Sequence, residues 1–144
     1  MKKIIITTLI FSISMLANTL FAQQVSRIQR QAIQSDNIEK FTAVFPKADF
    51  DKCLNVKDQS YTMLSYSILN NKKAISNFLL NNKADVNKAC NGITPLMNAA
   101  MHGNADMAKM LLKKGASKSA KNSNGETAKD IAKKNNHPEL AKIL

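Results

Sequence analysis

Residues 91–104 read NGITPLMNAAMHGN, and this stretch decides the fold. The pair Asn91-Gly92 is typical of a tight hairpin turn, which needs positive φ angles. Thr94 can cap a following helix through its hydroxyl, and Pro95 suits the first helical position. Small and apolar residues then follow until Gly103 breaks the helix. The stretch therefore predicts a hairpin that leads into a short helix.

A second helix is expected directly afterwards, from about Asp106 to Lys114. Its inward side chains follow the i, i+3, i+4 spacing of an amphipathic helix; they are Met107, Ala108, Met110 and Leu111. Gly115 is expected to end this helix in a left-handed conformation. Residues 91–115 thus predict one hairpin–helix–turn–helix unit.

The unit recurs along the chain. Residues 124–137, NGETAKDIAKKNNH, repeat the pattern 33 residues later, so that Gly92 falls on Gly125 and Thr94 on Thr127. Towards the N-terminus, residues 60–64 align with residues 92–96, and residues 82–87 resemble residues 46–51. Recurrence near 33 residues indicates an architecture of stacked repeats.

The repeated unit resembles the ankyrin repeat. The matching residues are Gly92-Ile93-Thr94-Pro95-Leu96, Ala99-Ala100, Gly103, Leu111-Leu112 and Gly115-Ala116. The resemblance covers the chain after its first residues. It implies an all-α fold, an ankyrin-repeat solenoid of about four helix-turn-helix units with short inter-repeat hairpins. The expected units are residues 24–56, 57–88, 89–121 and 122–144.

Some residues depart from the family pattern. Met97 stands where the family usually has His, so the side-chain hydrogen bond of that His should be lost in this unit. The second unit has Met63 in place of Pro and Ser67-Ile68 in place of the alanine pair. The lysines and asparagines of the last unit suit a terminal repeat, whose outer face meets water.

Residues 1–22 are expected to form a signal peptide. Lys2 and Lys3 precede an uncharged, mostly apolar stretch at 4–17, and Ala22 offers a small residue for cleavage before Gln23. A membrane anchor is the alternative, but about 14 residues fall short of the roughly 20 that a spanning helix needs. The repeat domain, residues 23–144, is therefore expected in the periplasm or outside the cell.

The chain is strongly basic. Its formal net charge is +11, and removal of Lys2 and Lys3 leaves +9. Such a surface favours acidic partners or anionic membranes. We do not expect a nucleic-acid partner, because the chain is exported and its lysines lack interleaved aromatic residues. The densest lysine group is Lys109, Lys113, Lys114, Lys118 and Lys121.

The sequence carries little sign of catalytic chemistry. There is no CxxC pair, no Gly-x-Ser-x-Gly elbow and no phosphate-binding glycine loop. His102 and His137 match no metal or catalytic spacing. Cys53 and Cys90 lie in successive inter-repeat connections and could form a disulfide in an oxidising compartment; the alternative is two free thiols in loops. We expect no enzyme, no cofactor and no metal site.

The family resemblance implies that hairpin tips and first-helix edges bind a partner protein. Carried over by position, this surface comprises Asp58, Gln59, Tyr61, Leu69, Asn70, Cys90, Asn91, Ile93, Met101, His102, Ser123, Asn124, Glu126, Lys134 and Asn135. The partner-binding candidates are Tyr61, Leu69, Asn91, Ile93, Met101 and His102. Four of these are apolar at positions where solubility alone favours polar residues. They could instead pack on one another or on the first hairpin.

Two functions remain open. The leading hypothesis is an exported, monomeric, non-enzymatic module that binds another protein, for example an inhibitor or immunity protein that blocks an acidic toxin. The second is a structural protein that binds an anionic envelope surface through its basic face, an attraction that salt would screen.

Overall fold

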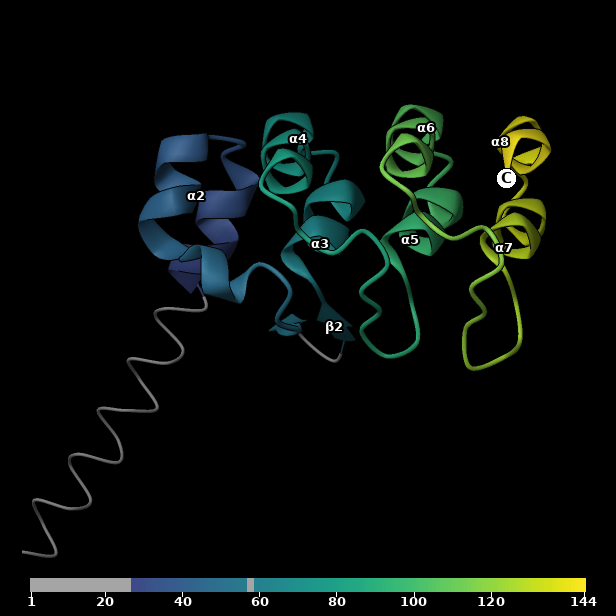
Figure 1. Cartoon of the computed structure of the whole chain (residues 1–144), viewed down its shortest axis with the longest axis horizontal. Coiled ribbons are helices and arrows are strands. Elements are labelled where there is room, and N and C mark those ends of the chain that lie inside the picture. Colours follow the sequence, from purple (N-terminus) through teal and green to yellow (C-terminus); the bar gives the residue numbers. More distant parts are fainter. Residues whose placement is uncertain (1–26, 57–58) are drawn as a thin grey trace, which may run out of the picture.

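The structure, a computed structural model, describes residues 27–56 and 59–144. The expected signal peptide, residues 1–22, lies outside the described residues. Helices lie in pairs, side by side in a row (Figure 1). The first unit contains a helix at 27–34 and α2 (Ile38–Val44). The later pairs are α3 (Met63–Leu69) with α4 (Lys73–Asn81), α5 (Pro95–Met101) with α6 (Ala105–Lys113), and α7 (Ala128–Lys134) with α8 (Pro138–Ile143).

The row has two layers of helices. In Figure 1, α4, α6 and α8 form one layer, and α3, α5 and α7 form the other. The connections between pairs project beyond α3, α5 and α7. The first of them follows a 3-10 turn, η1 (Lys47–Asp49), and contains β1 (Leu54–Val56) and β2 (Gln59–Tyr61), which pair antiparallel. The described chain is thus a mostly helical repeat fold, and the all-α expectation must be extended by a two-stranded sheet.

A threonine is the N-cap residue of each of α3, α5 and α7, as was expected of Thr94. Thr62, Thr94 and Thr127 each accept a backbone N–H from three residues further along, at 3.0, 3.3 and 3.3 Å. The third residue after each threonine differs between the repeats. The Asp130 carboxylate accepts the Thr127 N–H at 3.0 Å, whereas the Ser65 hydroxyl has no hydrogen-bond partner among the described residues.

The expected loss of a side-chain hydrogen bond at Met97 was wrong. The Met97 sulfur lies 3.5 Å from the Thr94 nitrogen and accepts its N–H, which completes a capping box. A thioether sulfur is a weak acceptor, but it can take the place of a histidine nitrogen here. The repeat therefore keeps a weaker form of the bond.

The turns differ between repeats. Asn91 and Gly92 both have positive φ, 51° and 76°, and Cys90 and Ile93 exchange two backbone hydrogen bonds around them at 3.2 and 3.0 Å. A turn is also present at Asn124-Gly125: Gly125 has a φ of 76°, and its N–H bonds to the Asn122 carbonyl at 2.9 Å, but the Asn122 N–H bonds to the carbonyl of Glu126, four residues on, at 3.0 Å. The Asn122 side chain accepts the N–H groups of Asn124 and Glu126, both at 2.9 Å, and this local bonding stabilises a wider loop.

A continuous apolar core runs through the row. Leu96, Ala99 and Ala100 of α5 are at most 1% exposed, and the small alanines let α5 pack against both α3 and α7. Met107, Ala108 and Leu111 of α6 are also buried, while Met110 is only half-buried. Phe41, Phe45 and Phe50 of the first unit form a cluster with Phe78 of α4, with ring centroids 4.9–6.0 Å apart. Burial of each large side chain contributes about 1.5–3 kcal/mol.

Polar side chains of one repeat also satisfy the backbone of the next. The Asp36 carboxylate accepts the N–H groups of Ala74 and Ile75 at 3.2 and 3.0 Å, so the first unit caps α4. Asp51 accepts the Asp85 N–H at 2.7 Å, and Asn87 accepts the Ser117 N–H at 2.8 Å. These bonds fix the register between neighbouring repeats.

Candidate functional site

The candidate site is a groove of about 600 Å3 between the second and third repeats. The β1–β2 hairpin forms one wall, the turn at 90–93 forms the other, and the C-terminal ends of α3 and α5 contribute the rest. The groove is lined by Gln59, Ser60, Tyr61, Leu69, Cys90, Asn91, Ile93, Asn98, Met101 and His102. The structure thus brings together all six partner-binding candidates.

The apolar side chains of the groove come from equivalent positions of the second and third repeats. Leu69 and Met101 are the last residues of α3 and α5. Tyr61 lies in β2, and Ile93 is held by its two bonds to Cys90. Met101 is 37% exposed, and the other three are half-buried. The four side chains therefore have a packed side and a side that faces solvent, as a contact surface requires.

Amide and hydroxyl groups complete the lining. Asn98 is only 2% exposed, and its side-chain N–H donates to the Thr94 carbonyl at 3.4 Å. Ser60 bonds to the amide oxygen of Asn55, and the Tyr61 hydroxyl donates to Gln59. Ser60 and Asn98 were missed from the sequence. Asn98 could have been found, because it precedes Met101 by three residues and so shares its helix face.

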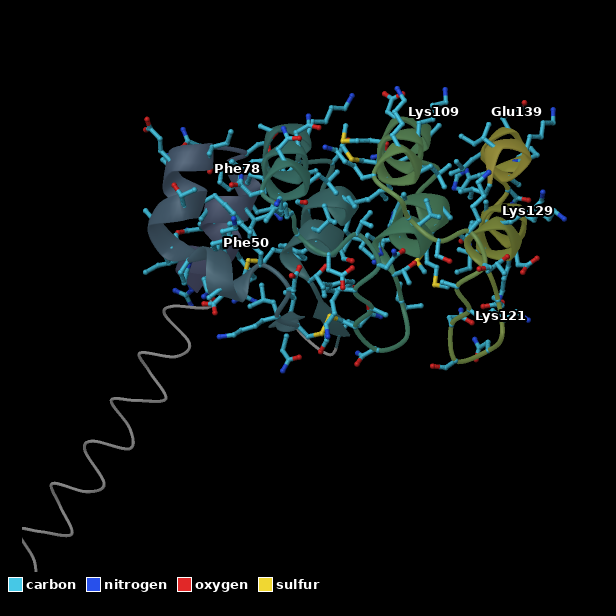
Figure 2. All side chains as sticks on the ribbon, in the orientation of Figure 1. Phe50, Phe78, Lys109, Lys121, Lys129 and Glu139 are labelled. Atoms are coloured by element: carbon cyan, nitrogen blue, oxygen red, sulfur yellow. A yellow bond between two sulfur atoms is a disulfide. The ribbon has the colours of Figure 1, made fainter. Side chains whose placement is uncertain are left out.

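None of the described residues that line the groove is Asp, Glu, Lys or Arg. This absence of charge contrasts with the net charge of +11 on the whole chain. Lys109 and Lys129 instead lie on the outside of the row, on α6 and α7 (Figure 2). The groove is therefore a neutral, partly apolar hollow on a basic protein.

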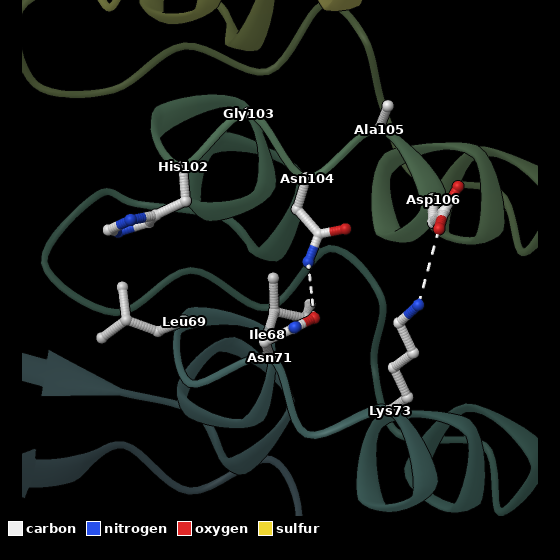
Figure 3. A pocket seen from close by; sticks show the side chains of 9 residues that line it. All are labelled: Ile68, Leu69, Asn71, Lys73, His102, Gly103, Asn104, Ala105 and Asp106. Carbon is white, nitrogen blue, oxygen red and sulfur yellow. Dashed lines mark hydrogen bonds and ion pairs between the residues drawn. The ribbon is translucent and has the colours of Figure 1, made fainter.

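A second hollow of about 510 Å3 continues from the groove, sharing Leu69 and His102 with it (Figure 3). It passes between the two helix–helix turns, where the Asn104 amide donates to Asn71 at 3.4 Å. Further on, Lys73 and Asp106 form an ion pair at 3.5 Å. Both charged side chains are more than half exposed, so the pair contributes little stability and can rearrange around a ligand.

In the structure, Cys53 and Cys90 form a disulfide. Their sulfur atoms are 2.05 Å apart and their Cα atoms 5.8 Å apart. Cys53 directly precedes β1, and Cys90 is part of the groove lining. The bridge therefore links the two walls of the groove.

Of the other surface candidates, Gln59 and Cys90 also line the groove, whereas Asn70 and those of the last repeat do not. Asn70 accepts a hydrogen bond from Gln34 at 2.7 Å, and Asp58 lies outside the described residues. The last repeat holds the remaining set, Ser123, Asn124, Glu126, Lys134 and Asn135, away from the groove lining. Lys134 bonds to Glu126 at 2.8 Å, which lowers the pKa of the Glu126 carboxyl and raises the pKa of the Lys134 amine.

Within residues 27–56 and 59–144, no group of three or more His, Cys, Asp or Glu side chains is arranged to hold a metal ion. In the same part of the chain, no helix has the length and apolar character needed to cross a bilayer. The described hollows thus offer surfaces for non-covalent contact, with amides, hydroxyls and apolar groups as their main chemistry.

Comparison with known families shows a resemblance to a repeat family. A family model described as ankyrin repeats, in three copies, matches residues 64–144. The matched region is more than half of the chain and contains all the helices from α4 to α8.

Proposed function

Because the chain belongs to the ankyrin-repeat family, whose repeats are generally protein–protein interaction modules, we propose that it binds another protein in the groove between its second and third repeats. The family is typically non-enzymatic, and binding without catalysis is the proposed activity. The observation that carries the proposal is the convergence of Tyr61, Leu69, Ile93 and Met101 on one solvent-facing hollow.

The lining defines the kind of segment that the groove accepts. Apolar side chains on both sides can surround one apolar or aromatic side chain of the partner, the arrangement that dominates binding energy at interfaces. The amide of Asn91 and the side chain of Gln59 can form hydrogen bonds with the partner backbone. Since no described lining residue carries a full charge, the inserted segment should be uncharged, because a buried charge would lack a partner.

The wider surface supports an acidic partner. Lysines outnumber acidic residues, and positive potential steers negatively charged proteins towards the groove. The proposed location is the periplasm or the extracellular space, on the basis of residues 1–22. The proposed form is a monomer, and one concrete role is that of an inhibitor or immunity protein for an acidic toxin.

Substitution of groove residues tests the proposal. The purified protein and a Met101→Asp variant are immobilised and used to capture proteins from envelope and medium fractions. The variant should lose a specifically bound protein, because it places a charge in the apolar hollow. The matched control is Ile38→Asp, which alters a 41% exposed apolar residue on α2, outside the groove. If Met101→Asp still captures that protein as well as Ile38→Asp and the unchanged protein do, the groove is not the binding site, provided that circular dichroism shows the same helix content.

A second candidate is attachment to an anionic envelope surface. In the last two repeats, Asp106, Glu126 and Glu139 form ion pairs with lysines at 2.6–3.5 Å. The negative charge of these side chains is therefore neutralised, which favours attachment to an anionic surface. The side chains of Lys109 on α6 and Lys129 on α7 lie on the outside of the row (Figure 2). Sedimentation with phosphatidylglycerol vesicles at low salt, lost at moderate salt and unaffected by Met101→Asp, would support this function instead.

A further inference from the structure

The disulfide and the groove share an element, the turn at 90–93. Cys90 is a lining residue of the groove, and Cys53 is tied to it across a sequence separation of 37 residues. Cys53 is followed at once by β1, so the bridge anchors the base of the β1–β2 hairpin. Gln59, Ser60 and Tyr61, which form the opposite wall, belong to the same hairpin.

The hairpin packs on the helical core through Leu54, Val56 and Tyr61, but few polar contacts tie it to the turn at 90–93. Each strand has three residues, and a two-stranded hairpin is at best marginally stable by itself. Among the described residues, no backbone hydrogen bond links 54–61 to the turn at 90–93. Leu54, Val56 and Tyr61 are only half-buried. The nearest polar tie is the bond from the Asp85 N–H to Asp51, below the hairpin. The disulfide is therefore a covalent tie between two walls that share no backbone hydrogen bond among the described residues.

The two cysteine residues differ in their exposure to solvent. Cys53 is exposed, whereas Cys90 is 3% exposed. An attacking thiolate reaches a disulfide through its accessible sulfur, and the other sulfur becomes the leaving group. The asymmetry directs attack to Cys53.

We propose that the Cys53–Cys90 bridge is a thiol–disulfide exchange site for a low-molecular-weight thiol, and that exchange opens the groove. The incoming thiolate forms a new S–S bond with Cys53, the bond between Cys53 and Cys90 breaks, and Cys90 leaves as a thiolate that takes a proton from water. No net oxidation occurs, because one disulfide replaces another. The β1–β2 hairpin then separates from the turn at 90–93.

The helical core does not depend on the bridge. Neither cysteine belongs to the main cluster of buried apolar side chains, which extends from Ile33 to Leu144. Exchange at Cys53 should therefore loosen 54–61 without unfolding the helix pairs. The consequence for a bound partner rests on the proposed function of the groove; the exchange chemistry does not.

The test uses the purified oxidised protein and reduced glutathione as the probe. After incubation, free thiols are blocked with N-ethylmaleimide, and peptides are mapped by mass spectrometry. We expect glutathione on Cys53 in roughly tenfold excess over Cys90, in line with the exposure of the two cysteine residues. Amide hydrogen exchange over 54–61 should become about tenfold faster, as expected for local opening, while α5 remains unchanged. Predominant labelling of Cys90, or unchanged exchange over 54–61, would overturn the proposal.

Two variants act as controls. Cys90→Ser removes the bridge without added glutathione and should reproduce the faster amide hydrogen exchange over 54–61. A Cys53→Ser, Cys90→Ser variant should show the same exchange and take up no glutathione. A loss of helix content in these variants would contradict local opening. These readouts need no partner, so a failure of partner capture at the groove would refute the proposed function and leave the exchange site standing, and the reverse also holds.

Discussion

The imidazole ring of His137 lies directly against the backbone of Gly103. A Cβ atom added to Gly103 would be 2.6 Å from Cε1 and 2.7 Å from Nδ1 of that ring. Gly103 lies in the turn between α5 and α6, and His137 is the N-cap residue of α8. The last repeat thus places an imidazole in the space that the missing side chain of Gly103 leaves in the third.

Gly103→Ala should therefore destabilise the protein. Gly103 has a φ of +65°, which an alanine adopts with strain, and the new methyl group would collide with the imidazole. We expect a loss of about 1–3 kcal/mol in the free energy of unfolding, measured by urea denaturation. Gly115→Ala is the matched control: φ is +89°, but no atom lies within 4 Å of its added Cβ. An equal effect of both substitutions would show that the His137 contact contributes nothing.

Leu111→Ala should remove a central contact of the stack. Leu111 is 0% exposed and belongs to the continuous core. Loss of its side chain should cost about 2–5 kcal/mol, including the cavity left behind. Leu112→Ala serves as the comparison, since Leu112 is only half-buried and should cost less. Thermal melts of the two variants that coincide would argue against the stacked core.

Two serines of α3 should respond in opposite directions to the same substitution. The Ser65 hydroxyl is buried and has no hydrogen-bond partner in the part of the chain that the structure describes, so Ser65→Ala should leave stability unchanged or raise it by up to about 1 kcal/mol. The Ser67 hydroxyl bonds to the Leu64 carbonyl and to Ser76, both at 2.8 Å. Ser67→Ala should cost about 1 kcal/mol. Chemical denaturation distinguishes the pair, and a destabilised Ser65→Ala would indicate a bond to that hydroxyl.

The last repeat should be sensitive to acid. Hydrogen bonds from the side chain and then the backbone of Thr127 lower the pKa of the Asp130 carboxyl below its ordinary value of 3.8. The folded state therefore binds this proton less readily than the unfolded state, so its contribution is present above pH 3.8 and is lost as pH falls through the folded pKa. Glu126, with its pKa lowered chiefly by the bond from Lys134, acts in the same direction.

Asp130→Asn tests this pH dependence. The variant should be less stable than the wild type near neutral pH, and the difference should shrink as the solution becomes acidic, because the wild type then loses its carboxylate. Unfolding curves at several pH values provide the measurement. A difference that stays constant through the acidic range would show that Asp130 contributes through its shape and not through its charge.

The sequence predicted the parts of the molecule that periodicity encodes. Tyr61 and Ile93 are 32 residues apart, as are Leu69 and Met101, so stacking brings each pair to the same groove. The threonine caps followed from the same repetition. Sheet strands as short as β1 and β2 gave no such signal, because three residues cannot establish an alternating pattern.

The missed features depend on individual side chains. The turn at 122–126 is wider than its equivalent at 90–93 because Asn122 bonds to two backbone N–H groups. Met97 replaces a histidine with a sulfur acceptor, and His137 contacts a glycine in the preceding repeat. A repeat pattern records which positions are buried or turning. It does not record the bonds that one unusual residue makes there.

The neutral lining of the groove has a kinetic consequence. The chain as a whole is strongly basic, whereas no described lining residue of the groove is charged, so attraction over a distance and contact at the end of binding involve different atoms. For an acidic partner, added salt should slow association by screening the lysines, while dissociation from the apolar hollow should proceed at nearly the same rate. A complex of this kind would form slowly in salt water and, once formed, would last as long as in dilute buffer.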